Sequence, residues 1–196
     1  MSAPEGEYYT EERWQNWIDR LTAEEIDLED EESGRLLQNF QDDTVIAIAK
    51  IVSDYDDEML DEETALSELA DVREIVLTDL ELDEENTLML VNAVQTALVC
   101  VFYAAEEYVV DDETETDVEQ CIHAARDAEA QEEFETALGY CAQAGSAIIA
   151  GEELPPDAGE EIEYGPVADW ITGLRSLQGA MADPEVVEPE DSESAS

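Results

Sequence analysis

The sequence predicts an all-α protein: a compact bundle of six or seven helices around a central apolar helix, with a helical hairpin in the C-terminal half. Apolar residues recur in segment after segment at the three- and four-residue spacing that places them on one helix face. No useful length of chain alternates polar and apolar residues with the period of two that a half-buried strand shows.

The first helix is expected after Thr10, whose hydroxyl can cap it. Its apolar stripe consists of Trp14, Trp17, Ile18 and Leu21. Thr22 and Glu25 then have the spacing of a capping box, which predicts a further short turn or helix.

Three longer helices should follow. One runs from about Ser33 to Asp54, and Asp61 can cap the next. Asp83 can cap a third that reaches Val110. The middle of this third helix is apolar nearly all round, so we expect the other helices to surround it.

The C-terminal half should hold a helical hairpin and a last helix. Thr116 and Glu119 form a capping box ahead of the first hairpin helix, and the hairpin should turn around Glu129 to Glu132. The second hairpin helix would pack through Phe134, Ala137, Leu138, Cys141, Gly145 and Ile148. The last helix is expected to start at Gly165 and Pro166, because proline is favoured at a first helical position.

Composition predicts the domain organisation. Residues 1–7 should be a disordered N-terminus, and residues 8–182 a single all-α domain with possible sub-units at 8–110 and 116–182. Residues 183–196 have the composition of a disordered acidic tail.

The charge is extreme, since 55 Asp and Glu stand against six Arg and a single Lys, Lys50, for a formal charge of −48. Such a chain repels itself in dilute buffer, whereas at about 1 M salt the Debye length falls to roughly 3 Å and the repulsion is screened. We therefore expect a cytoplasmic protein of a salt-accumulating halophile, a haloarchaeon. The seven basic residues are scattered, which argues against direct nucleic-acid binding.

The N-terminus has no basic or apolar run of the kind found in a secretory signal. The most apolar stretch, Leu88 to Ala105, contains Asn92, Gln95 and Thr96 and has no flanking Lys or Arg. It is interpreted as a buried helix, so no membrane association is expected. The oligomeric state stays open.

The sequence indicates no catalytic residue, cofactor or metal site. A zinc site would have to be built from Cys100, Cys121, His123 and Cys141, whose spacing does not suit it. Residues 111–117 and 54–65 resemble calcium loops only superficially, because both lack the required glycine. Carboxylate pairs for acid–base catalysis are too numerous to locate; Glu68 and Glu74 lie nearest to apolar patterns and should be solvated.

The aromatic residues Tyr8, Tyr9, Trp14 and Trp17 cluster at one end of the chain and form a candidate partner interface, because Trp and Tyr are favoured at interface hot spots. The alternative is that Trp14 and Trp17 anchor the first helix to the core, which their spacing with Ile18 and Leu21 also suits.

Two resemblances add to this picture. Residues 134–144, FETALGYCAQA, resemble the centre of a tetratricopeptide repeat, although Glu132 stands where that repeat usually turns on glycine and no second copy follows. This resemblance implies a local hairpin only. Segments 8–21, 41–53, 65–77, 90–108 and 182–188 are similar, in this order, to a family of small haloarchaeal proteins known as a domain of unknown function, which implies an archaeal, intracellular, salt-adapted protein without assigned site residues.

The function expected from these observations is a non-catalytic protein–protein interaction module, acting as an adapter, regulator or complex subunit with a protein partner. One alternative is an acidic nucleic-acid mimic that occupies a basic surface. The other is an enzyme with an unrecognised carboxylate or metal site.

Overall fold

The computed structural model describes residues 8–24, 26, 30–111, 116–160 and 165–182. Within these residues the chain is all-α, as the sequence predicts. The seven helices are α1 (Glu11–Ala23), α2 (Glu31–Asp56), α3 (Glu62–Val76), α4 (Glu85–Val110), α5 (Val118–Ala130), α6 (Phe134–Ile149) and α7 (Pro166–Ala182). The predicted disordered ends, 1–7 and 183–196, lie outside the described residues, and the division into sub-units stays a prediction.

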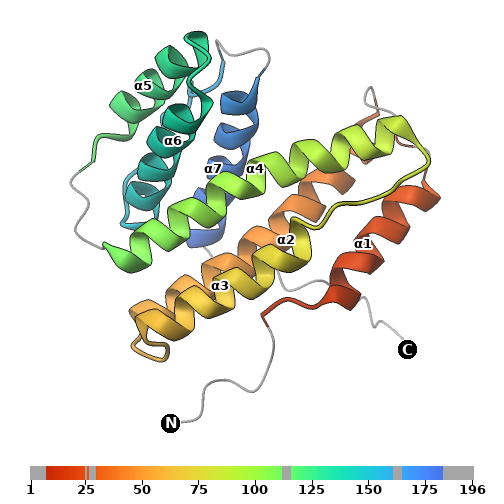
Figure 1. The fold of residues 1–196 in the computed structure, drawn as a ribbon, viewed down its shortest axis with the longest axis horizontal. Coiled ribbons are helices and arrows are strands. Elements are labelled where there is room, and N and C mark those ends of the chain that lie inside the picture. Colours follow the sequence, from red (N-terminus) through yellow and green to blue (C-terminus); the bar gives the residue numbers. More distant parts are fainter. Residues whose placement is uncertain (1–7, 25, 27–29, 112–115, 161–164, 183–196) are drawn as a thin grey trace.

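Helix α4 is the centre of the fold, as its apolar composition predicts. It contacts α2 and α3 on one side and α6 and α7 on another. Figure 1 shows α4 crossing the molecule as a long diagonal between α3 and the group formed by α5, α6 and α7. Its fully buried residues include Leu98, Val101 and Phe102.

Two of the predicted caps are confirmed. The Thr10 hydroxyl accepts the Arg13 N–H at 3.1 Å, and the Asp61 carboxylate accepts the Thr64 N–H at 2.8 Å. Both satisfy a backbone donor that the first turn of a helix leaves unpaired.

Three other caps are corrected by the structure. Asp117, not Thr116, caps α5 by accepting the Gln120 N–H at 3.1 Å, and α4 begins after Glu84 rather than Asp83. Thr22 starts no new helix, since it lies inside α1 and its hydroxyl donates to the Ile18 carbonyl at 2.6 Å. Glu25, its predicted capping-box partner, lies outside the described residues.

The predicted hairpin is formed by α5 and α6, which pack against each other. The chain turns at residues 131–133, and Glu132 has a φ of 62°, the left-handed conformation that glycine adopts most easily. The prediction for Phe134 is wrong, because its side chain is 46% exposed. Phe134 is the first residue of α6, where the partner helix α5 has already ended.

Two features position the start of α7: the backbone conformation of Gly165 and a hydrogen bond from the Val167 N–H. Gly165 has a φ of 119° and leads into Pro166 at the first helical position. The Glu129 carboxylate, on α5, accepts the Val167 N–H at 3.1 Å and so caps α7 from a residue 38 positions earlier.

Glycines let α6 and α7 approach α4 closely. A Cβ on Gly173 would lie 2.5 Å from the Ala97 carbonyl oxygen, and a Cβ on Gly145 would clash with Ala104 and Leu174. At Gly173 the α7 backbone therefore lies against the α4 backbone, and at Gly145 the α6 backbone lies against the side chains of Ala104 and Leu174.

Candidate functional site

The predicted aromatic cluster lies where α1 packs on α2. Tyr9 and Trp14 are only 3% exposed, and the Trp14 ring packs on Phe40 with ring centroids 4.8 Å apart. Tyr8 and Trp17 are half-buried. The structure therefore places Tyr9 and Trp14 in the core and leaves only Tyr8 and Trp17 with surface to offer a partner.

The accessible pair already has partners within the chain. The Tyr8 hydroxyl donates to the Asp54 carboxylate, and the Trp17 indole N–H donates to Asp43 at 2.8 Å. Burial, together with the Asp54 carboxylate, raises the pKa of Tyr8 above its ordinary value, so this hydroxyl remains a proton donor at neutral pH. The cluster holds α1 on the bundle; its role as a partner interface stays a prediction.

Asp43 is the polar residue at the centre of this contact, and the sequence pattern alone did not identify it. It is 8% exposed and accepts from both the Arg13 guanidinium, whose Nε lies 2.8 Å away, and the Trp17 indole. The signal was present, since Asp43 follows Phe40 at i+3 and so falls on the buried face of α2. A buried carboxylate requires such partners, so Arg13 and Trp17 offset the cost of its desolvation.

The three cysteines are buried on α4, α5 and α6. Burial raises the pKa of Cys100, and the neighbouring Cys141 thiol adds to the rise. Burial likewise raises the pKa of Cys121. The Cys100 and Cys121 thiols are therefore protonated at neutral pH, which disfavours nucleophilic or metal-binding chemistry at these two residues.

His123 does not join these cysteines. It is exposed on α5, and its Nε2 lies 3.8 Å from a Glu119 carboxylate oxygen one turn away. Among the described residues no group of three His, Cys, Asp or Glu side chains is arranged to hold a metal ion.

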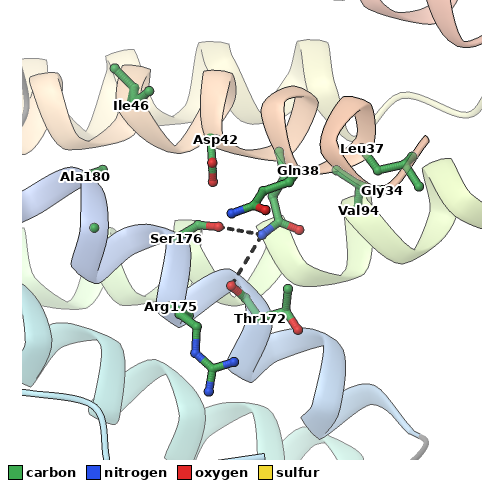
Figure 2. Close-up of a pocket in the computed structure, with 12 residues that line it drawn as sticks. Gly34, Leu37, Gln38, Asp42, Ile46, Val94, Thr172, Arg175, Ser176 and Ala180 are labelled. Carbon is green, nitrogen blue, oxygen red and sulfur yellow. Dashed lines mark hydrogen bonds between the residues drawn. The ribbon is translucent and has the colours of Figure 1, made fainter. Parts of the chain in front are cut away.

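A cleft of about 590 Å³ lies between α2 and α7 (Figure 2). Leu37, Ile46, Val94 and Ala180 supply its apolar lining. Gln41, 5% exposed, donates to the Thr172 carbonyl at 3.3 Å and to the Ser176 hydroxyl at 2.8 Å, so its amide group joins the two helices. Residues that line the cleft therefore also hold α2 and α7 together.

One ionisable group faces this cleft. Asp42 projects from α2 toward α7, and burial raises its pKa, opposed by a hydrogen bond with Ser176 (Figure 2). Arg175 also lines the cleft, but its guanidinium turns away from Asp42 and donates to the Ala158 carbonyl at 2.8 Å. A single carboxyl can exchange a proton, but acid–base catalysis needs a second convergent group.

The most distinctive surface is a row of residues along the outward face of α4, which we name the α4 outer stripe. Its members are Met89, Asn92, Thr96, Val99, Tyr103, Glu106 and Val110. Met89, Tyr103 and Val110 are 56%, 47% and 64% exposed, and they are three of the five large apolar side chains that the described residues expose. No charged residue occurs from Asn86 to Ala105. Six of the seven members are thus neutral in a protein of charge −48, and the seventh, Glu106, forms an ion pair with Arg73 of α3.

Three comparisons with known proteins and the apolar character of one helix complete the description. A family model described as an uncharacterised protein conserved in archaea (DUF2150) matches residues 7–190. No curated protein and no solved structure matches the chain. Among the described helices α4 alone is long and apolar enough to cross a membrane, but half of its most apolar 18-residue window is buried inside the protein, as in a core helix.

Proposed function

We propose that this chain, which belongs to a family of uncharacterised proteins conserved in archaea, is a non-catalytic protein–protein interaction module that binds through the α4 outer stripe. The observation that carries the proposal is the contrast in charge. The chain has 55 acidic residues, yet the middle of its most central helix is neutral on the exposed side as well as on the buried side.

The physical argument concerns what an acidic surface can bind. A partner that approaches most faces of this protein must desolvate carboxylates, which costs free energy unless each is paired. On the outer stripe the groups removed from water are methyl, thioether, hydroxyl and amide groups, one phenol, and a single carboxylate, that of Glu106, which already pairs with Arg73 of α3. Tyr103, an exposed member of the stripe, is the kind of residue that dominates binding energy at interfaces.

We propose further that the module works in the salt-rich cytoplasm of a halophile. Salt of about 1 M screens charges beyond roughly 3 Å but leaves apolar contacts intact. A binding surface made of neutral and apolar groups therefore keeps its affinity where one made of ion pairs would lose it.

The experiment compares two substitutions that add one carboxylate at an exposed apolar site. Tyr103→Glu alters the outer stripe, and Met59→Glu, at a residue 55% exposed in the turn after α2, is the matched control. Each tagged variant is expressed in a haloarchaeal host and purified with washes at about 2 M KCl, where electrostatic contacts are screened. The proposal expects a stoichiometric protein partner with wild type and Met59→Glu, and its loss with Tyr103→Glu. Retention of the partner by Tyr103→Glu contradicts the proposal.

The charge itself supports a second candidate, an acidic mimic of nucleic acid that occupies a basic surface. This candidate predicts the opposite results in the same experiment. A mimic loses its partner as KCl is raised, nucleic acid competes for that partner, and Tyr103→Glu leaves binding unchanged.

A further inference from the structure

We infer that the occupant of the α4 outer stripe is a second copy of this chain, docked antiparallel about a two-fold axis beside Val99. This inference rests on the proposed function, because it names the partner of the same surface. It requires that the stripe be compatible with its own image. Four of its seven members then meet one another across the axis, and Asn92, Val99 and Glu106 meet residues beside the stripe.

The spacing is that of a helix–helix seam. The seven members of the stripe lie alternately three and four residues apart, from Met89 to Val110. This alternation keeps one line of side chains facing a partner helix over about 31 Å, at a rise of 1.5 Å per residue. Every member is exposed or half-buried, and Glu106 forms an ion pair with Arg73 of α3.

The antiparallel register pairs chemically compatible groups. With the axis between Val99 and Cys100, Met89 of one copy meets Val110 of the other, and Thr96 meets Tyr103. These are an apolar pair and a pair of hydroxyl-bearing side chains, respectively. A two-fold interface makes each contact twice, so both ends of the seam gain an apolar pair.

The register also keeps carboxylates apart. Glu106 and Glu107 lie near the C-terminal end of α4 and, in this arrangement, face the neutral Ala93 and Asn92 of the partner copy. The Asn92 amide is a donor of the kind that a carboxylate accepts. A parallel docking would instead place the four carboxylates together, with only the Arg73 guanidinium that pairs with each Glu106 to offset them, and would align the two helix dipoles unfavourably.

A second copy fits this surface better than two other occupants. A partner helix with basic residues beside its apolar face would meet acidic residues only at the C-terminal end of the stripe, because residues 86–105 carry no charge. A membrane surface would have to accept a protein of charge −48, which anionic lipids repel.

The first test is the mass in solution at about 2 M KCl, by sedimentation equilibrium over a range of protein concentrations. We expect wild type and Met59→Glu to approach twice the chain mass of 21.8 kDa. Thr96→Glu and Tyr103→Glu should remain at the chain mass, since each places two new carboxylates beside the axis. Circular dichroism confirms that the variants, substituted at surface positions, stay folded.

The second test reads the register. Thr96→Cys and Tyr103→Cys are prepared separately, mixed and oxidised with a mild disulfide-forming reagent that couples two thiols and takes up their two electrons and two protons. The mixture should give a cross-linked dimer of one copy of each variant, and each variant alone should give far less. Wild type is the control, because its three cysteines are buried.

Each outcome has one meaning. A monomeric wild type at every concentration overturns the second-copy inference, and the proposed function then still stands if Tyr103→Glu loses a different protein in the purification described above. A dimer that Thr96→Glu and Tyr103→Glu leave intact overturns the placement of the interface on α4. Cross-linking of Thr96→Cys with itself, in preference to Tyr103→Cys, overturns the antiparallel register.

Discussion

The contact of α1 with α2 and the contact of α7 with α4 are built in opposite ways. Large rings fill the first, where Trp14 and Trp17 pack on Phe40 with centroids 4.8 and 5.8 Å apart. The second has no ring at its closest point, because Gly173 brings the α7 backbone against the Ala97 carbonyl. In the first contact the side chains keep the two backbones apart. In the second contact the missing side chain of a glycine lets the two backbones approach closely.

The two contacts also differ in what surrounds them. The first is completed by charged groups, since Arg13 pairs with the buried Asp43. The second is apolar, with Val101 beside Gly173. The N-terminal contact thus depends on electrostatics and on ring volume, whereas the central contact depends on close fit, and the two should respond differently to salt and to substitution.

The largest expected effect is the response of the whole chain to dilution of salt. Lowering KCl from molar to about 0.01 M extends the Debye length to roughly 30 Å, so the repulsion among the carboxylates is no longer screened. We expect the helical signal in circular dichroism to fall, with the amides of α1 exchanging with deuterium before those of α4. An unchanged spectrum and melting temperature at low salt would contradict the salt-adapted interpretation.

The next largest effect should follow from emptying the ring-filled contact. Trp14→Ala removes a buried ring and should lower the free energy of unfolding by about 3–5 kcal/mol, measured by urea titration in molar KCl. Trp14→Phe is the control. It keeps a ring over Phe40 and gives up an indole N–H that has no hydrogen-bond partner among the described residues, so it should cost clearly less. Equal losses would show that ring volume does not hold this contact.

Filling the close-fit contact should have a smaller but definite effect. Gly173→Ala places a Cβ 2.5 Å from the Ala97 carbonyl oxygen, and such overpacking costs about 1–3 kcal/mol. Gly179→Ala, on the same helix with no atom near its added Cβ, should be neutral or stabilising by up to about 1 kcal/mol. Thermal unfolding of the two variants side by side measures the difference, and a Gly173→Ala protein as stable as Gly179→Ala would refute the close approach.

The smallest expected effect is a pH dependence at the seam between α2 and α7. Burial raises the pKa of Asp42 above its ordinary 3.8, so the folded state holds the proton more tightly than the unfolded chain. Its contribution to stability is therefore full below pH 3.8 and is lost as the pH rises through the folded pKa. Asp42→Asn should weaken the fall in urea midpoint as pH is raised from 4 to 7 in molar KCl, and Asp71→Asn, on the exposed face of α3, should not.

The same contrast explains which parts of the fold the sequence predicts. Large apolar residues at helical spacing mark the ring-filled contact, and the caps at Thr10 and Asp61 follow from residue type alone. Gly173 gives no such signal, because a glycine inside a helical stripe looks like a weak helix former until the neighbouring backbone is known. Phe134 was assigned to the core because periodicity does not show where the partner helix ends.

The candidate surface was missed for a related reason. The apolar stretch from Leu88 to Ala105 was interpreted as a buried helix, and composition cannot distinguish a fully buried helix from one with an exposed face. Exposure of Tyr103 and Val110 appears only when the other helices are in place. The aromatic cluster at Tyr8 to Trp17, by contrast, was recognisable as a cluster, but its division between core and surface depends on Asp43 and Phe40 of α2.

The bond between Glu129 and the Val167 N–H has a consequence for the start of α7. The acceptor lies at the end of α5, so the first turn of α7 is capped by another helix. Gly165 leaves the room for this carboxylate, since a side chain there would collide with it. The first turn of α7 therefore depends on the C-terminal end of α5, and any state in which that end is unfolded should leave the Val167 N–H without this cap.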